Sequence, residues 1–247
     1  MVANYLAIFS TVIEWQIMNN TLLKYMASKL SLRRWQSLAL RKLDDMRGLD
    51  FISVIRAEDV GLDPARSFRS SPSGNIHLYN VFRKLHITPS DRIIDIGCGK
   101  GSAMRTMLRF PFELVSGIEL SDQIGRIALM NFKLLRERRA EIHVCNAETF
   151  LSYEHFNIFY LYNPFPDDVM DVVIARIMNV RRNHASETTI IYNNPTCHSV
   201  LLNHGLFHLA SYPDEWGNGI SVYSNLPFVR SRLNYRSTQS QSLYAIF

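Results

Sequence analysis

Two stretches of the chain combine residue types whose spacing suits chemistry on a small ligand. Asp95 lies near the end of the apolar run 92–96, and glycines follow at positions 97, 99 and 101. Glycine permits positive φ and close ligand approach, and a carboxylate beside it suits a cationic group. In the second stretch, the apolar run 156–162 leads into Asn163-Pro164-Phe165-Pro166, where prolines stiffen a loop that presents an amide. Both stretches are therefore predicted to be strand ends that carry a binding site.

Two common phosphate-binding patterns do not fit the glycine stretch. A Walker A loop needs a glycine, four residues and then Gly-Lys-Ser/Thr, whereas Gly99-Lys100 is followed by Gly101 and the position five before Gly99 is Ile94. A dinucleotide fingerprint needs G-x-G-x-x-G, and a strand-end carboxylate would repel a pyrophosphate. Spacing and charge together favour a cationic ligand.

The spacing Asp95-x-Gly97-x-Gly99-x-Gly101 resembles motif I of class I S-adenosylmethionine-dependent methyltransferases. The resemblance implies that S-adenosylmethionine is the cofactor and that Asp95 faces its methionine ammonium, directly or through water. It also implies that the segment 97–101 lines the ligand, with contacts from Gly97, Cys98, Gly99 and Gly101.

The next apolar run, 114–120, contains Glu119, where this family places an acid on the ribose hydroxyls. A carboxylate can accept hydrogen bonds from both vicinal hydroxyls. The alternative is a strand-end acid that caps the helix beginning at Ser121.

The adenine position departs from the family pattern. The predicted strand 141–145 leads into Asn146-Ala147-Glu148, where the family usually has an acid that accepts from the adenine amino group. An amide oxygen can accept the same bond. The resemblance therefore implies cofactor contacts at Asn146 and Ala147, and leaves the adenine contact open between Asn146 and Glu148.

The Asn163 loop resembles in part the Asn/Asp-Pro-Pro-aromatic motif of amino-group methyltransferases, in which the Asn side chain and the next carbonyl hold a planar N–H donor. This implies catalytic roles for Asn163 and Pro164, a cofactor contact at Asn163 and a substrate contact at Phe165. The match is partial, because Phe165 and Pro166 stand where the motif has proline and an aromatic residue. The alternative is a turn that only begins the helix 167–181.

A near repeat of this arrangement, Asn193-Asn194-Pro195, follows the predicted strand 187–192. In the class I strand order the two strands are neighbours, and parallel neighbours lie about 5 Å apart. We therefore expect Asn194 to line the same acceptor cleft as Asn163.

The pattern of elements predicts an α/β fold, a three-layer sandwich with a mixed seven-stranded sheet and a helical N-terminal extension. Strands at 207–212 and 220–225, joined by the turn-rich segment 213–219, predict the closing antiparallel hairpin. The expected parts are a helical extension over 1–65, a class I methyltransferase domain over 66–228 and a polar, basic tail over 229–247.

Composition limits the class of protein. Hydrophobic residues make up 47% of the chain and charged residues 20%, which suits a soluble globular protein with a sizeable core. The net charge of +5 and the basic stretch 126–139 are compatible with nucleic acid, but no recognised nucleic-acid motif or interleaved aromatics accompany them, so a solvated helix face is favoured. Three cysteines, an odd number, suit a reducing compartment, and a cytoplasmic location is expected.

An amphipathic helix is predicted over residues 1–26. It is too interrupted by polar residues to be a spanning helix or a signal peptide, so it is expected to pack on the enzyme or on a second subunit. The sharper alternative is a helix lying on a membrane surface, helped by Lys24, Lys29, Arg33 and Arg34. The Cys and His residues at 197, 198, 204 and 208 match no zinc spacing, and no metal is expected.

The function that follows from these residues is methyl transfer from S-adenosylmethionine to an unidentified acceptor, with a nitrogen atom on a protein or small molecule favoured. The alternatives are methylation of oxygen on a glycan or lipid and a noncatalytic S-adenosylmethionine-binding protein. Oligomeric state and the identity of the acceptor are left open by the sequence.

Overall fold

The computed structural model describes residues 41–56, 58–61, 63, 72–182, 187–214, 217–228 and 232–233. The chain forms two compact units, Met1–Leu49 and Asp50–Phe247. In the first unit residues 41–46 are helical. The helix predicted over 1–26 and the domain boundary predicted at 65 both lie outside the described residues and stay predictions.

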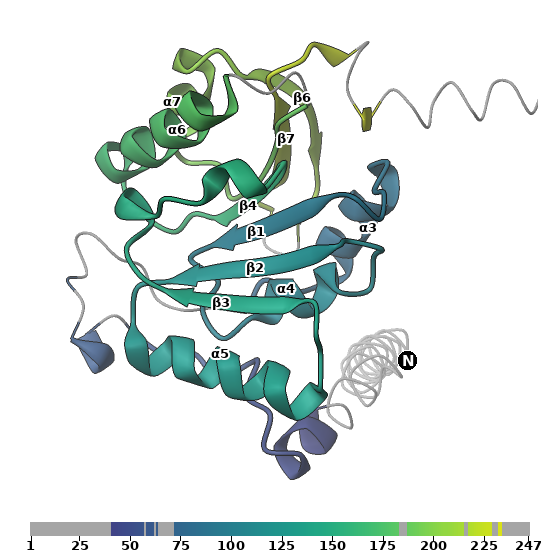
Figure 1. Cartoon of the computed structure of the whole chain (residues 1–247), viewed down its shortest axis with the longest axis vertical. Helices are drawn as coiled ribbons and strands as arrows, with labels where there is room; N and C mark the ends of the chain where they lie inside the picture. The colour runs from purple at the N-terminus through teal and green to yellow at the C-terminus, as the bar shows by residue number, and fades with distance from the viewer. Residues whose placement is uncertain are drawn as a thin grey trace, which may run out of the picture. The chain divides into compact units, whose positions relative to one another are not determined.

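A seven-stranded sheet forms the centre of the second unit (Figure 1), in the order β3-β2-β1-β4-β5-β7-β6. Its strands are β1 (Arg92–Ile96), β2 (Leu114–Glu119), β3 (Ala140–Val144), β4 (Ile158–Tyr162), β5 (Thr189–Asn193), β6 (Phe207–Tyr212) and β7 (Ile220–Ser224). The strands β1 to β5 are parallel to one another, and β7 is antiparallel to both β5 and β6. The predicted mixed sheet with a closing antiparallel hairpin is therefore confirmed.

Helices connect and cover these strands. They are α3 (Ile76–Lys84), α4 (Ser102–Met107), α5 (Asp122–Leu135), α6 (Asp167–Arg181) and α7 (His198–Asn203), with short 3-10 turns η1 (Glu58–Val60), η2 (Ala147–Thr149) and η3 (Tyr153–His155). The helix α5 ends at Leu135, because Arg136 adopts the left-handed conformation with φ of 54° and closes the helix.

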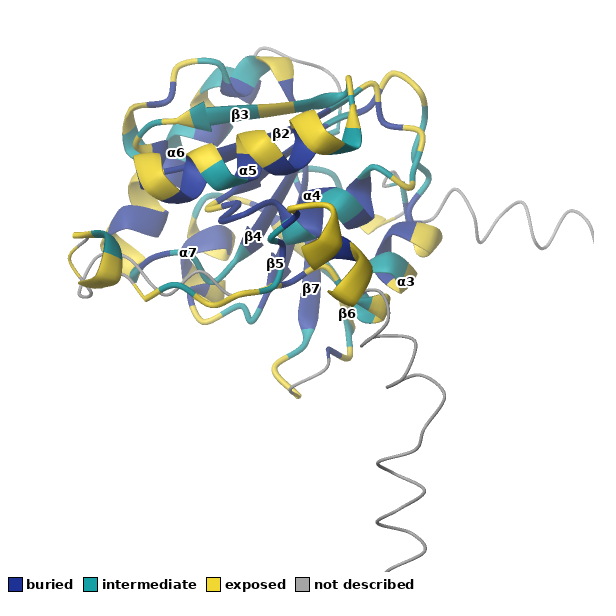
Figure 2. Cartoon of the chain, turned by 90° about the horizontal axis from the view of Figure 1, so that it is seen from below, coloured by how far each residue is buried: buried dark blue, intermediate teal, exposed yellow. Residues whose placement is uncertain are grey.

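The two faces of the sheet pack differently because side chains alternate along each strand. Ile94 and Phe159 belong to the apolar cluster that α6 completes with Val173. On the opposite face Asp95 pairs with Gly117, and a Cβ atom at Gly117 would lie 2.7 Å from Met104 Sδ of α4. In Figure 2 the strands β4, β5 and β7 are largely dark blue, whereas the edge strand β3 is not, and α5 is exposed on its outward face. The layers are therefore helix, sheet and helix.

Arg232 ties the C-terminal part of the chain to the amino edge of this sheet. Its guanidinium Nη1 lies 3.2 Å from Asp91 Oδ2, and its backbone N–H donates to Glu187 Oε2 at 3.0 Å. Asp91 immediately precedes β1, and Glu187 lies two residues before β5. The residue falls in the stretch 229–247 expected to be a polar tail, so this tail contributes a buried ion pair to the fold.

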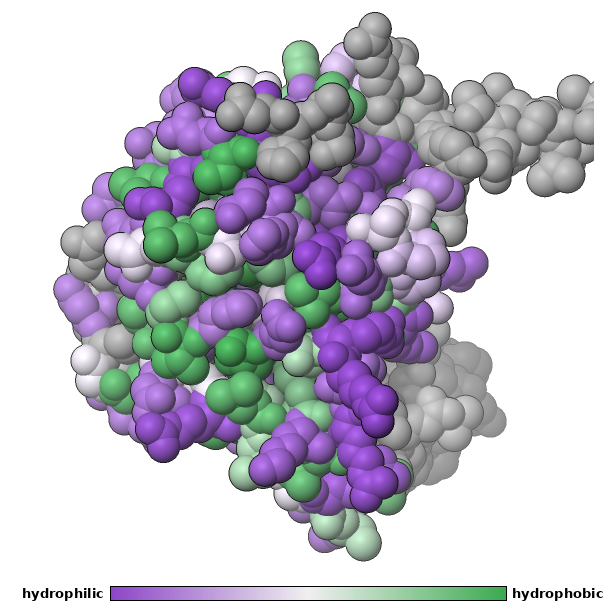
Figure 3. Space-filling model, viewed as in Figure 1, coloured by the Kyte–Doolittle hydropathy of each residue, from purple (hydrophilic) through white to green (hydrophobic). Residues whose placement is uncertain are grey.

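The outer surface of the second unit is mixed in character. Over the face shown in Figure 3, apolar side chains lie among polar ones. The exposed apolar residues of α5 are Leu129, Met130 and Leu134. Among the helices that the structure describes, none combines the length and the apolar character needed to cross a bilayer.

Candidate functional site

The loop between β1 and α4 has the backbone geometry that the glycine pattern predicts. Gly97, Gly99 and Gly101 have φ of 81°, 54° and 86°. A Cβ atom at Gly97 would lie 2.8 Å from the Cβ of Pro164, and one at Gly101 would lie 2.7 Å from Cζ of Phe132. Both distances are shorter than ordinary carbon contacts. Glycine is therefore required here both for the turn and for close packing against the Asn163 loop and α5.

Two buried carboxylates lie at the carboxyl ends of β1 and β2. Asp95 is 2% exposed and Glu119 is 7% exposed. Glu119 accepts hydrogen bonds from the Gly99 N–H at 3.0 Å through Oε2 and from the Ser121 N–H at 2.9 Å through Oε1. Among the described residues, the Asp95 carboxylate accepts no side-chain or loop hydrogen bond. The glycine loop thus holds Glu119 in a fixed orientation, whereas the Asp95 carboxylate can still accept hydrogen bonds from a ligand.

The electrostatics of this pair favour a cationic ligand. Burial, and then the neighbouring charge of Glu119, raise the pKa of Asp95 well above its ordinary value. Burial also raises the pKa of Glu119, although the backbone donors at Ser121 and Gly99 oppose this. Burial and the two acids raise the pKa of the Cys98 thiol, which keeps this side chain neutral. A cation placed at Asp95 would relieve the repulsion between the two carboxylates.

A network that the sequence did not reveal holds the glycine loop from the other side. Lys100 is 3% exposed, and its Nζ donates to Asp50 Oδ1 at 2.6 Å and to the Ser53 hydroxyl. Asn131 of α5 donates through Nδ2 to the backbone carbonyls of Asp50 (2.8 Å) and Lys100 (3.0 Å), and it accepts from the Asp50 N–H at 2.8 Å. The segment beginning at Asp50 is therefore part of the loop's support, although it lies within the stretch 1–65 assigned to the extension.

The residues expected to contact adenine lie together after β3. Asn146 Oδ1 accepts from the Glu148 N–H at 2.8 Å, and Asn146 Nδ2 donates to Glu148 Oε2 at 3.2 Å. Asn146 is exposed and Ala147 is 8% exposed. The amide oxygen already caps η2, which leaves the carboxylate of Glu148 as a second acceptor at the same place.

The Asn163 loop follows β4 and contacts the glycine loop through Pro164. Asn163 has φ of 39°, a left-handed conformation that Asn tolerates better than most residues. Its Oδ1 accepts from the exposed Thr196 hydroxyl at 2.5 Å and from the Tyr192 hydroxyl at 3.4 Å. Phe165, expected to contact substrate, is 8% exposed and belongs to the apolar cluster beneath α6. Packing, in addition to any contact with substrate, therefore explains an aromatic residue at 165.

The loop after β5 repeats this geometry. Asn194 has φ of 53°, and its N–H donates to the Gly219 carbonyl at 3.0 Å. Tyr162 pairs with Asn193, so Asn163 and Asn194 leave neighbouring strands at the same register position. The structure therefore brings the two asparagines to one edge of the sheet, as the strand order predicted.

A further polar cluster next to these loops was not found from the sequence. Asn193 Nδ2 donates to the Tyr160 hydroxyl at 3.4 Å, and Asn193 Oδ1 is buried without a partner among the described residues. The Ser73 side chain also hydrogen-bonds the Tyr160 hydroxyl, and the Gly74 N–H donates to Ser102 Oγ at 3.2 Å. The segment 72–74 therefore lies at the start of α4.

No group of three or more His, Cys, Asp or Glu side chains suited to a metal ion occurs in the part of the chain that the structure describes. His198 Nδ1 instead lies 2.7 Å from the Tyr223 hydroxyl, and His208 Nε2 lies 3.0 Å from Ser211 Oγ. Two of the histidines considered in the sequence analysis, His198 and His208, therefore have partners within the fold.

Comparisons with known proteins identify the fold. No family model matches the chain, and no curated protein matches its sequence. Among solved structures, a ribosomal protein L11 methylase from Lactobacillus delbrueckii subsp. bulgaricus is similar with a TM-score of 0.51 and 13% identity, over 67% of this chain and 83% of that one. The mitomycin 7-O-methyltransferase MmcR has a TM-score of 0.49 and 15% identity, over 60% of this chain and 52% of that one, so the chain spans about half the length of that protein.

The strand order and the likeness to the L11 methylase define the fold of this chain. The fold is that of the class I, Rossmann-like S-adenosylmethionine-dependent methyltransferases, with the mixed seven-stranded sheet of that class. The acidic and glycine-lined loop lies at the carboxyl ends of β1 and β2, where α/β sheets of this kind bind ligands.

Proposed function

We propose that this protein is an S-adenosylmethionine-dependent methyltransferase that acts on a nitrogen atom of a protein or small molecule. The observation that carries the proposal is the pair of buried acids, Asp95 and Glu119, in a glycine loop whose backbone cannot accept a side chain at Gly97 or Gly101. A cofactor with an ammonium group and a ribose matches this pair in charge and in hydrogen-bonding capacity.

In this proposal each residue has a defined part in binding. Asp95 pairs with the methionine ammonium, and Glu119, held by the N–H groups of Gly99 and Ser121, accepts from the ribose hydroxyls. Gly97, Cys98, Gly99 and Gly101 present backbone and a neutral thiol to the ligand. Asn146 and Ala147 border the adenine, with Glu148 as a further acceptor.

The bound cofactor supplies an electrophilic methyl group on a sulfonium centre. The chain's contribution is to hold the acceptor in line with that group, which is the main way an enzyme accelerates such a transfer. Asn163 and Pro164 lie against the glycine loop, and the Asn163 amide oxygen already accepts from the exposed Thr196 hydroxyl. In this proposal the Asn163 amide oxygen accepts a hydrogen bond from the N–H of the methyl acceptor. This N–H replaces the Thr196 hydroxyl as the donor. Asn194, on the neighbouring strand end, borders the same acceptor.

Calorimetry with S-adenosylmethionine tests the cofactor assignment. The wild-type protein should bind it, and Asp95→Ala and Gly99→Val should each lower the affinity at least tenfold, since the first removes the charge partner and the second adds a β-branched side chain at φ of 54°. Lys133→Gln, an exposed change on α5, should bind as wild type does. Unchanged affinity in both site variants would refute the cofactor site.

The enzyme assignment needs a separate measurement. Labelled methyl groups from S-adenosylmethionine should appear in a fraction of cell extract, with equal production of S-adenosylhomocysteine. Binding without any such turnover would favour the noncatalytic alternative. Product labelled on oxygen in a glycan or lipid would favour the O-methyltransferase alternative.

A further inference from the structure

A groove between α3 and the end of β6 lies outside the cofactor loop. It has a volume of about 370 Å³ and is lined by His77, Asn80, Val81, Arg83, Lys84, Tyr212 and Pro213. Small-molecule pockets in proteins begin at about this size. The groove has no assigned role in the site described above.

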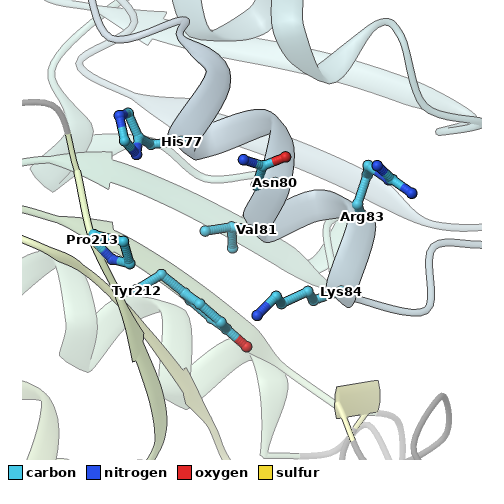
Figure 4. Close-up of a pocket in the computed structure, with 7 residues that line it drawn as sticks. All are labelled: His77, Asn80, Val81, Arg83, Lys84, Tyr212 and Pro213. Carbon is cyan, nitrogen blue, oxygen red and sulfur yellow. The ribbon is translucent and has the colours of Figure 1, made fainter.

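The lining of the groove is basic on one side and aromatic on the other. His77, Asn80, Val81 and Lys84 occupy positions i, i+3, i+4 and i+7 of α3, so they share one face of the helix. Figure 4 shows that Lys84 points toward Tyr212 while Arg83 points away from it. The Lys84 ammonium lies 4.8 Å from the centre of the Tyr212 ring. The backbone positions of His77 and Lys84 thus lie about 10 Å apart along one helix face, and Lys84 is beside an aromatic ring.

No acidic side chain is among the described residues that line this groove. The nearest acid in sequence, Asp214, accepts from the Asn218 N–H at 2.8 Å within the hairpin loop. A negative charge entering the groove therefore meets cations and an aromatic face, and no lining carboxylate repels it. Lysine and histidine donors bind anionic oxygens, and an aromatic ring stacks on planar groups.

The register of the sheet connects this groove with the acceptor loops. Tyr212 pairs with Ile220, Ile220 pairs with Asn193, and Asn193 pairs with Tyr162, so the four residues form one row at the carboxyl edge. Three strand spacings of about 4.8 Å separate β4 from β6. The groove therefore begins roughly 14 Å from the Asn163 loop. It lies on the opposite side of that loop from Glu119, in the strand order β2-β1-β4-β5-β7-β6.

The start of α3 provides the second connection. His77 follows the helix cap Asn75, and the preceding Ser73 and Gly74 contact Tyr160 and Ser102 beside the glycine loop. One end of the groove is therefore adjacent to the segment that borders the cofactor loop, and the other end is at Lys84. This arrangement suits an extended ligand with one end at each place.

We propose that the groove binds the distal part of the methyl acceptor, and that this part is a planar ring carrying an anionic group such as a phosphate or carboxylate. The inference rests on the proposed function, because it assigns the groove to the same acceptor. Lys84 holds the anionic group, Tyr212 stacks on the ring, and His77 contacts the portion that leads to the Asn163 loop.

Phenyl phosphate is a suitable probe, since it combines the ring and the anion without a methylatable nitrogen. Ligand-observed NMR on the full chain should show saturable binding that Lys84→Gln and Tyr212→Leu each weaken roughly tenfold. Lys84→Arg should retain binding because it keeps the charge, and Lys133→Gln on the exposed face of α5 should change nothing. Phenol and inorganic phosphate should each bind more weakly than phenyl phosphate.

Four outcomes separate this inference from the proposed function. Binding of phenyl phosphate that survives saturation with S-adenosylhomocysteine and is lost in Lys84→Gln supports the groove. Displacement of phenyl phosphate by S-adenosylhomocysteine would place it in the cofactor loop and overturn the inference, as would equal binding by wild type, Lys84→Gln and Tyr212→Leu. Failure of the protein to bind S-adenosylmethionine, with groove binding intact, would instead refute the proposed function and the link between the two sites.

Discussion

Gly97 and Pro164 are in direct contact, because a Cβ atom on Gly97 would lie 2.8 Å from the Cβ of Pro164. The first residue belongs to the loop after β1 and the second to the loop after β4, and these strands are neighbours in the sheet. The proposed cofactor loop and the proposed acceptor loop therefore cannot move independently at this point. This contact and three other interactions each have a measurable consequence.

Gly97→Ala should impair both loops. The new methyl group is at φ of 81° and must displace Pro164, so we expect weaker S-adenosylmethionine binding together with slower methyl transfer. Gly205→Ala is a matched control, because Gly205 has φ of 79° but no atom lies within 4 Å of its added Cβ. The control should lose about 1 kcal/mol of stability through strain alone and keep its affinity. Urea unfolding and calorimetry measure the two effects, and equal affinity losses in both variants would contradict the contact.

Cofactor affinity should rise with pH. The folded-state pKa of Asp95 is raised above 3.8, so its contribution to stability is fully present below about pH 4 and is lost as pH rises through the raised pKa. A cationic ligand favours the ionised acid, so binding releases a proton below that pKa and strengthens as pH increases. Calorimetry across this range should show the trend for wild type and a shallower profile for Asp95→Asn, in which only Glu119 of the two acids still titrates.

The ligand 5′-methylthioadenosine serves as the control for this pH dependence. It keeps the ribose and adenine but lacks the ammonium, so its affinity should respond to pH through Glu119 alone and less steeply. Parallel pH profiles for wild type and Asp95→Asn with S-adenosylmethionine would show that Asp95 does not pair with the ammonium group.

The role of Asn163 can be separated from its backbone conformation. Asn163→Gly removes the amide and introduces glycine, which tolerates φ of 39°. Asn163→Ala also removes the amide but introduces backbone strain, because alanine rarely adopts this φ. Both variants should keep cofactor affinity within a few-fold and lower transfer to the native acceptor about a hundredfold, but Asn163→Ala should unfold at lower urea than Asn163→Gly.

Two controls accompany this experiment. Thr196→Val removes the hydroxyl that occupies the Asn163 oxygen and should leave transfer within a few-fold of wild type. Asp168→Ala, exposed near the start of α6, should change little. If Asn163→Gly turns over at the wild-type rate with the native acceptor, the asparagine serves only the turn.

Lys100 and Asp50 should be coupled in stability. Asp50→Asn leaves the buried Lys100 ammonium without its carboxylate and should lower the free energy of unfolding by about 2 kcal/mol. Lys100→Met removes the buried charge itself. The double variant should therefore lose less stability than the sum of the two single variants. Burial tends to raise the pKa of Asp50, but hydrogen bonds from Lys100 and Ser53 lower it below the ordinary value. Because the folded-state pKa is depressed, this contribution is present above pH 3.8 and is lost as pH falls through the depressed pKa.

Urea unfolding of the two single variants and the double variant gives the coupling energy. Asp63→Asn supplies a comparison at a carboxylate that is exposed and distant in sequence from Lys100. Strictly additive losses in the double variant would contradict the ion pair.

Local sequence patterns were sufficient to predict the fold class and the glycine loop. Apolar runs with β-branched residues, such as 92–96, are long enough for buried strands, and the periodic helix 122–135 follows a Ser cap at 121 that accepts from Ile124 N–H. Gly97, Gly99 and Gly101 were predictable because positive φ in a tight loop is a local property that glycine satisfies. These features depend on residues close together in the chain, so local pattern is sufficient to predict them.

Only the tertiary structure decided what surrounds that loop. Asp50, Lys100 and Asn131 are separated by up to 81 residues, and no local pattern indicates that a buried lysine will find its partner there. The groove between α3 and Tyr212 likewise forms from segments brought together by the strand order β5-β7-β6. Long-range packing places such groups, because the free energy of burying a charge or forming a cavity depends on all the elements that meet there.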